Sequence, residues 1–189
     1  MGAIWLIIGG VRSGKSRLAC RLAAESGLPV SYIATAEPRD GEMSAKIATH
    51  QRERPPNWRT IEEPTAIRHA LSVAGDGCAI VDCLTLWLSN RLPPAWRDNP
   101  PALEDIDAEA KAILAELDQV VKDCRGRSGP TIFVTNEVGS GIIPADAFSR
   151  AYENILGAVN QAVAAPAERV YLCHAGLALE LKGAGARSL

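Results

Sequence analysis

The stretch Gly9-Gly10-Val11-Arg12-Ser13-Gly14-Lys15-Ser16 decides how the rest of the chain is interpreted. A glycine, four further residues and then Gly-Lys-Ser form the phosphate-binding P-loop pattern. Glycine allows backbone angles that let N–H groups surround a phosphate, the lysine supplies a cation, and the serine hydroxyl can bind Mg²⁺. The alternative is a glycine-rich turn with an incidental Lys-Ser.

The sequence on either side of this stretch favours the P-loop. Residues 3–8 form a short apolar run that predicts a buried strand, and residues 17–24 predict a helix with Leu18 and Leu22 on one face. A helix that begins near Lys15 directs the positive end of its dipole at a bound phosphate. We therefore interpret residues 9–16 as a nucleotide site and Lys15 as catalytic.

Predicted strands and helices alternate along the chain. Strands are expected at 30–34, 78–82, 131–135 and 170–173, and helices at 42–52, 64–74, 103–124 and 145–164, with a proline-rich loop at 93–101. This alternation predicts an α/β fold, a mainly parallel sheet with helices on both faces. Because no repeat or linker is visible, we expect a single P-loop nucleotide-binding domain over residues 1–189.

Composition narrows the class of protein. The 189 residues include 20 basic and 22 acidic side chains, and a net charge of −2 gives no footprint for nucleic acid. No apolar run reaches the length of a membrane span, and residues 1–8 lack the features of a signal peptide. An odd number of cysteines without a Cys-x-x-Cys pair argues against disulfides and zinc, and Cys78 and Cys173 are expected in the core. We expect a cytoplasmic protein.

Four polar or glycine-rich features follow predicted strands: Gly9, Thr35, Asp82 and Asn136. Ligands of parallel sheets bind at the carboxyl ends of the strands, so these features predict one site. Asp82 ends an apolar strand, as the carboxylate that organises Mg²⁺ in P-loop enzymes does. Its alternative role is the N-cap of a helix from Leu84 onward.

A second set of candidates lies on the predicted helix at 42–52. Lys46 and His50 lie on one polar ridge, and a neutral imidazole is a competent nucleophile. The cations of Lys46, Arg52 and Arg54 could hold a triphosphate against His50, although an ordinary solvated surface gives the same pattern. Glu62 could accept hydrogen bonds from a base or a ribose, or could start a helix.

Taken together, these residues resemble the family of bifunctional adenosylcobinamide kinases/adenosylcobinamide-phosphate guanylyltransferases of cobalamin biosynthesis. The resemblance runs from about Ile4 to Lys182, and its most selective segments are 40–58, around His50, and 135–139, Thr-Asn-Glu-Val-Gly. Departures from the family pattern occur at 153–154 and 173–176. They lie outside the expected nucleotide site and leave corrinoid contacts and subunit packing open.

The resemblance implies a P-loop fold related to RecA, a cytoplasmic homotrimer and two reactions. ATP or GTP first phosphorylates the aminopropanol hydroxyl of adenosylcobinamide, and GTP then donates GMP, carried as a phosphoramidate on the residue that is His50 here. Ser16 and Asp82 would bind Mg²⁺. The implied nucleotide contacts are Gly9, Gly10, Val11, Arg12, Ser13, Gly14, Lys15, Ser16, Thr35, Ala36, Glu37, Gln51, Arg52, Glu53, Arg54, Glu62 and Asp82.

Two rival functions use the same P-loop. A monofunctional small-molecule kinase would use Lys15 and Asp82 and leave His50 idle. A GTP switch or a RecA-like motor would bind a macromolecular partner, but the chain has no Asn-Lys-x-Asp motif to recognise guanine and no excess of basic residues.

Overall fold

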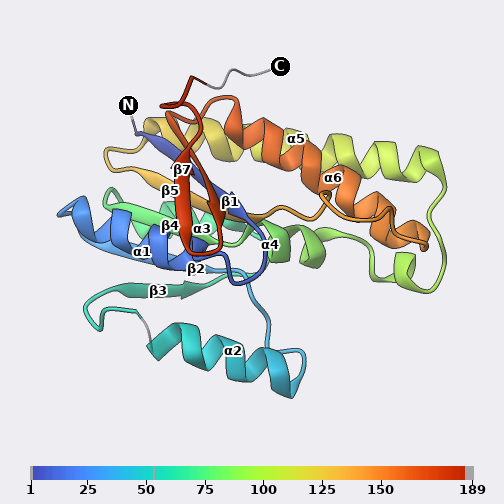
Figure 1. Cartoon of the computed structure of the whole chain (residues 1–189), viewed down its shortest axis with the longest axis horizontal. Helices are drawn as coiled ribbons and strands as arrows, with labels where there is room; N and C mark the ends of the chain where they lie inside the picture. The colour runs from blue at the N-terminus through green and yellow to red at the C-terminus, as the bar shows by residue number, and fades with distance from the viewer. Residues whose placement is uncertain (1, 53, 186–189) are drawn as a thin grey trace.

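The computed structural model describes residues 2–52 and 54–185. Its centre is a sheet with the strand order β3-β2-β4-β5-β1-β6-β7, in which all neighbours are parallel except the antiparallel pair β6 and β7 (Figure 1). The strands are β1 (Ile4–Gly9), β2 (Val30–Ala34), β3 (Arg59–Glu62), β4 (Cys78–Asp82), β5 (Thr131–Asn136), β6 (Arg169–His174) and β7 (Leu177–Glu180). The helices are α1 (Lys15–Glu25), α2 (Gly41–Arg52), α3 (Ile67–Ala74), α4 (Leu84–Arg91), α5 (Leu103–Gly126) and α6 (Ala147–Ala164), with a 3₁₀ turn at Pro94–Arg97.

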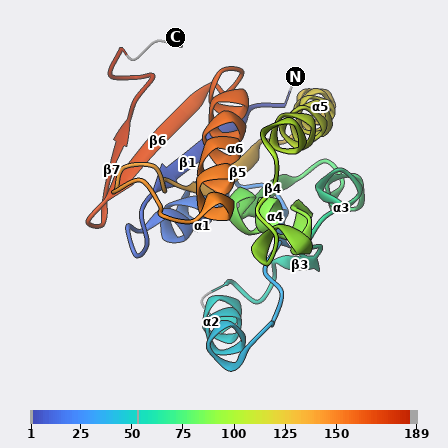
Figure 2. The ribbon, with the colours of Figure 1, turned by 90° about the vertical axis from the view of Figure 1, so that its right-hand side faces the viewer.

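Helices cover both faces of this sheet, because alternate residues of each buried strand point to opposite sides. On one face, Leu18 and Leu22 of α1 pack with Ile7, Tyr32 and other strand residues. On the other face, α3, α4, α5 and α6 surround a larger cluster that contains Trp87 (Figure 2). The predicted fold class, an α/β fold with a mainly parallel sheet and helices on both faces, is confirmed.

The carboxyl ends of the parallel strands meet at one edge, as predicted. Gly9 is in register with Asn136 of β5 and with Cys173 of β6, and Asp82 is in register with Ala34 of β2. β4 lies two strands from β1 because β5 intervenes. At about 4.8 Å per strand, Asp82 therefore lies about 10 Å along the edge from Gly9. Cys78 and Cys173 are core residues, as expected.

Several boundaries differ from the prediction. α3 begins at Ile67 rather than at Pro64, because the carboxylate of Glu63 accepts backbone N–H groups from Thr65 and Ala66 and closes a turn first. α6 begins at Ala147, after Asp146, whose carboxylate accepts the N–H of Ser149.

Other segments of the chain also differ from the prediction or extend it. Strands β3 and β7 were not expected from the sequence, and the loop predicted at 93–101 contains the 3₁₀ turn. Residues 181–185 form turns, and residues 186–189 lie outside the described residues. Among the helices of the described segments, none combines the length and the apolar character that crossing a bilayer requires.

Candidate active site

The loop between β1 and α1 has the shape that its glycines permit. A Cβ atom on Gly9 would lie 2.2 Å from the carbonyl oxygen of Cys173, so only glycine fits where β1 passes β6. Gly14 has a φ of 100°, in the left-handed region that favours glycine. The backbone thus turns tightly before α1 begins at Lys15, and the first N–H groups of α1 face the loop. This geometry matches a phosphate cradle.

Lys15 lies at the centre of this cradle. Its side chain is 9% exposed, and its ammonium group donates a 2.7 Å hydrogen bond to the carbonyl of Gly10. Burial lowers the pKa of Lys15, while Cys83, Asp82 and Cys173 act in the opposite direction. Burial raises the pKa of Cys83 to about 12, so that thiol is neutral near pH 7 and Asp82 supplies the opposing charge. The lysine is therefore a buried cation that gains from a bound anion.

Asp82 is held at the end of β4 by its neighbours on β2. The hydroxyl of Tyr32 donates a hydrogen bond to the Asp82 carboxylate, and burial raises the pKa of Tyr32 well above its ordinary value. The phenol thus stays protonated and remains a donor. Thr35 fixes the following residue, since its hydroxyl accepts the N–H of Cys83 at 2.8 Å and donates to the Cys83 carbonyl at 2.7 Å.

The N-cap position of α4 settles the alternative role of Asp82. Cys83 occupies that position, and its sulfur accepts the N–H of Leu86. Asp82 precedes this N-cap residue and does not cap the helix. Its carboxylate lies at the carboxyl edge of the sheet, where it interacts electrostatically with Lys15.

A buried network of hydrogen bonds joins the elements next to this edge of the sheet. The hydroxyl of Thr85 accepts the N–H of Asn136, while Thr135 donates a 2.7 Å hydrogen bond to the side-chain oxygen of Asn160. The amide group of Asn160 in turn donates to the carbonyl of Asn136 at 3.2 Å. Such satisfied networks rigidify the elements they join. Here they lock α4, β5 and α6 together beneath the site.

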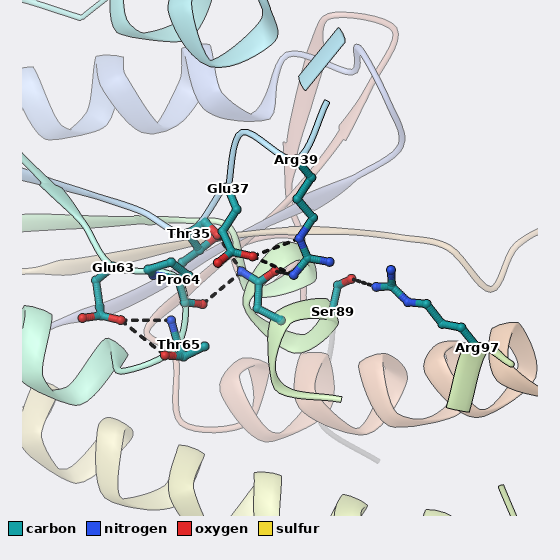
Figure 3. A network of polar contacts seen from close by, with 9 residues as sticks. Thr35, Glu37, Arg39, Glu63, Pro64, Thr65, Ser89 and Arg97 are labelled. Carbon is teal, nitrogen blue, oxygen red and sulfur yellow. Dashed lines mark hydrogen bonds and ion pairs between the residues drawn. The ribbon is translucent and has the colours of Figure 1, made fainter. Parts of the chain in front are cut away.

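Figure 3 shows the polar contacts on the loop after β2. The carboxylate of Glu37 receives two hydrogen bonds from Arg39, at 2.9 and 2.7 Å, and Arg39 also donates to the side chain of Asn90. The amide of Asn90 donates to the carbonyls of Thr35 and Pro64. Asn90 therefore ties residues 35–39 to α4, and these loop residues have a defined conformation next to Asp82.

The helix that carries His50 stands apart from the sheet. None of the residues of α2 is buried, and α2 lies beyond β3 in both views of the chain (Figures 1 and 2). The end of α2 and the residues that follow it contact the sheet through Gln51 and Arg54. Gln51 donates a 3.0 Å hydrogen bond to Glu62, and the guanidinium of Arg54 lies 3.7 Å from the centre of the Tyr32 ring.

The predicted site residues thus fall into two groups. Lys15 interacts electrostatically with Asp82, and residues 35–37 lie beside Asp82. The guanidinium of Arg54 lies over the ring of Tyr32, whose hydroxyl donates to Asp82. His50 and Arg52 are exposed on α2. The predicted contact Glu53 lies outside the described residues.

The sequence argument missed the part that Tyr32 plays in this site. A signal for it was present, because Tyr32 is a polar-tipped residue inside a strand that leads to the site. A buried phenol or indole usually finds a hydrogen-bond partner, so a tyrosine here indicates a nearby acceptor.

Comparison with known proteins identifies the family. A family model described as cobinamide kinase / cobinamide phosphate guanyltransferase matches residues 5–181. The bifunctional adenosylcobalamin biosynthesis protein CobP of Pseudomonas aeruginosa is 49% identical over 181 residues, which cover 94% of this chain and 96% of that protein. The bifunctional adenosylcobalamin biosynthesis protein CobU of Escherichia coli is 36% identical over 179 residues, covering 94% and 98% of the two chains.

Among solved structures, the chain is similar to a KaiC-like protein of Pyrococcus horikoshii, with a TM-score of 0.47 and 16% identity over 90% of this chain and 70% of that chain. A RadB recombinase gives a TM-score of 0.43 and 16% identity over 90% and 74%. The family match covers nearly the whole chain, including the P-loop and Asp82. The chain belongs to the cobinamide kinase / cobinamide phosphate guanyltransferase family.

Proposed function

We propose that this protein first phosphorylates adenosylcobinamide and then transfers GMP to the product, yielding adenosylcobinamide-GDP. The observation that carries the proposal is the placement of the buried Lys15 cation and the Asp82 carboxylate at one sheet edge, beside a glycine-lined loop. The bifunctional relatives and the family match support the same pair of reactions.

In the first reaction, the hydroxyl oxygen of the aminopropanol arm attacks the γ-phosphorus of ATP or GTP. A new P–O bond forms, the bond to the β-phosphate oxygen breaks, and the nucleoside diphosphate leaves while the proton of the hydroxyl passes to solvent water. Phosphoryl transfer of this kind depends on positioning and charge neutralisation. The loop N–H groups and Lys15 neutralise the phosphate charge, and Tyr32 keeps Asp82 in place.

The oxygen ligands at this edge fit a nucleotide-bound Mg²⁺. Mg²⁺ is usually held by one or two carboxylates together with substrate phosphates and water. Asp82 provides a carboxylate, and Ser16, at the first turn of α1, provides a hydroxyl. Bound there, the ion would neutralise charge on the transferring phosphate.

In the second reaction, an imidazole nitrogen of His50 attacks the α-phosphorus of GTP. A P–N bond forms as the bond to the pyrophosphate oxygen breaks. A phosphate oxygen of adenosylcobinamide phosphate then attacks the same phosphorus and displaces the imidazole. Because α2 buries none of its residues, His50 can approach the nucleotide without disrupting the core. Glu62 and Gln51, already hydrogen-bonded to one another, are polar candidates for guanosine contacts.

Labelling with α-³²P GTP tests the histidine intermediate. We expect the wild-type protein to acquire acid-labile, alkali-stable label, and His50→Ala to lose it while retaining part of the kinase activity. His69→Ala is the matched control, because His69 is also an exposed histidine on a helix, α3. A chase with adenosylcobinamide phosphate should move the label to the corrinoid. Full labelling of His50→Ala would contradict the proposed intermediate.

A further inference from the structure

A cavity lies directly beside the P-loop, on the side away from Asp82. It has a volume of about 350 Å³, within the range of about 300–1,000 Å³ typical of small-molecule sites. The family resemblance assigns a nucleotide contact to none of its lining residues except the two that belong to the P-loop itself. The lining residues are Ser13, Gly14, Arg17, Leu18, Arg21, Cys173, Gly176, Leu177 and Ala178.

The cavity is continuous with the phosphate cradle. Ser13 and Gly14 belong to both, and the N–H of Gly176, in the turn between β6 and β7, donates a 3.1 Å hydrogen bond to the carbonyl of Ser13. The turn lies beside the P-loop in both views (Figures 1 and 2). The hydroxyl of Ser13 is buried and has no hydrogen-bond partner within residues 2–52 and 54–185. A ligand that enters the cavity therefore borders the phosphate site.

The strand order fixes which end of a nucleotide faces this cavity. Asp82 lies on the β5 side of β1, whereas the cavity lies on the β6 side. Lys15 and Asp82 hold the terminal phosphates and their Mg²⁺ in the proposed kinase reaction. The nucleoside must then leave the cradle in the opposite direction, toward the β6–β7 turn.

The lining suits a purine nucleoside. Leu18 and Cys173 are buried and form an apolar surface, which Leu177 and Ala178 extend. The guanidinium of Arg17 lies against two backbone segments, since its Nη2 atom would be 3.7 Å from a Cβ atom on Gly14 and also from one on Gly176. No acidic side chain of the described segments pairs with Arg17. Guanidinium groups stack on aromatic rings, so Arg17 can lie against the base.

We propose that this cavity holds the base and ribose of the phosphoryl donor, ATP or GTP. The inference rests on the proposed kinase function. The lining contains no carboxylate, so it lacks the acidic acceptor that would select the N–H edge of guanine. A residue that selects the base would have to lie elsewhere. Glu62, at the end of β3, is four strand spacings from β1, which is about 19 Å along the edge at about 4.8 Å per strand, so it lies far outside the cavity.

Calorimetric binding of ATP, GTP and inorganic tripolyphosphate, each with Mg²⁺, tests this inference, because tripolyphosphate carries the phosphates without a nucleoside. The wild-type Kd values for ATP and GTP should agree within about threefold. Ala178→Trp fills the cavity and should weaken both nucleotides by about tenfold or more, while tripolyphosphate binding stays within about twofold. Leu179→Trp is the matched control on the same strand, since Leu179 does not line the cavity.

Arg17→Ala provides a second variant that leaves β7 intact, and it should show the same selective loss. ATP binding by Ala178→Trp and Arg17→Ala that equals wild type would overturn the proposal, as would an equal loss of tripolyphosphate and ATP. Failure of the proposed function gives a different result: the wild-type protein would bind nucleotides with these properties but transfer no phosphate to adenosylcobinamide.

Discussion

Lys15 shows how a single residue can be tuned by its surroundings. Its burial disfavours the charged form, and the nearby Asp82 carboxylate partly compensates. Lys15→Ala should therefore lower the kcat/KM of the kinase reaction by about 10- to 150-fold, corresponding to about 1.5–3 kcal/mol for a hydrogen bond to a charged group. Guanylyl transfer should also fall, because both reactions begin with a bound triphosphate.

Steady-state kinetics with ATP and adenosylcobinamide check this expectation. Lys122→Ala serves as the control, because Lys122 is an exposed lysine paired with Asp118 on α5. Kinase activity of Lys15→Ala equal to that of the control would argue against the P-loop as the phosphate site.

Glu63 gives a prediction about pH. The N–H groups of Ala66 and Thr65 donate to its carboxylate and hold the pKa of Glu63 below its usual value of 4.5. A lowered pKa in the folded protein means that the stabilisation is present above about pH 4.5 and is lost as pH falls through the folded pKa. Glu63→Gln should cost about 1 kcal/mol of unfolding free energy at pH 7, like the loss of a helix cap.

Urea unfolding of both proteins across the acidic range checks this sign. The difference between wild type and Glu63→Gln should shrink as the pH falls below about 4.5. A difference that stays constant through this range would show that the charge of Glu63 contributes nothing.

At the scale of elements, the sequence predicted the buried strands and missed the edge strands for one physical reason. Strand β4 consists of buried apolar residues almost throughout, which is a strong signal. Strands β3 and β7 end the sheet and expose most of their side chains, so neither shows an apolar pattern. Their pairing depends on a neighbour that is distant in sequence for β3 and on a short turn for β7.

The helices α1 and α2 are similar in length but differ in how they are held. Five residues of α1 are buried, whereas no residue of α2 is. Helical stability in proteins comes mainly from packing of one face, so α2 should open locally far more often than α1. Hydrogen–deuterium exchange should therefore label the amides of α2 well before those of α1. Equal protection of the two helices would contradict this expectation.

At the scale of the molecule, we propose a homotrimer, as the family resemblance implies. The surface carries large apolar side chains that a monomer leaves in water, including the neighbouring Ile142 and Ile143, which are 96% and 79% exposed. Exposed apolar residues of this kind mark interaction surfaces when they cluster. Sedimentation equilibrium should give three times the chain mass of 20.1 kDa. A mass of 20.1 kDa at every concentration tested would exclude the trimer.

Much of the site was predictable because its chemistry is local in sequence. The P-loop brings Gly9, Gly14 and Lys15 together within eight residues, and Asp82 ends a readable strand. The bond from Tyr32 to Asp82 and the approach of Gly176 to Ser13 were not predictable. Both depend on which strands are neighbours, and alternation of strands and helices does not determine that order.

The position of β5 between β1 and β4 gives the sheet edge a direction. In the arrangement we propose for the kinase reaction, the phosphates of the donor lie toward β4 and its nucleoside lies toward β6. The proposed guanosine contacts, Gln51 and Glu62, lie at the β3 end of the same edge. Under both proposals, the GTP used in guanylyl transfer therefore places its base on the opposite side of the P-loop from the base of the phosphoryl donor.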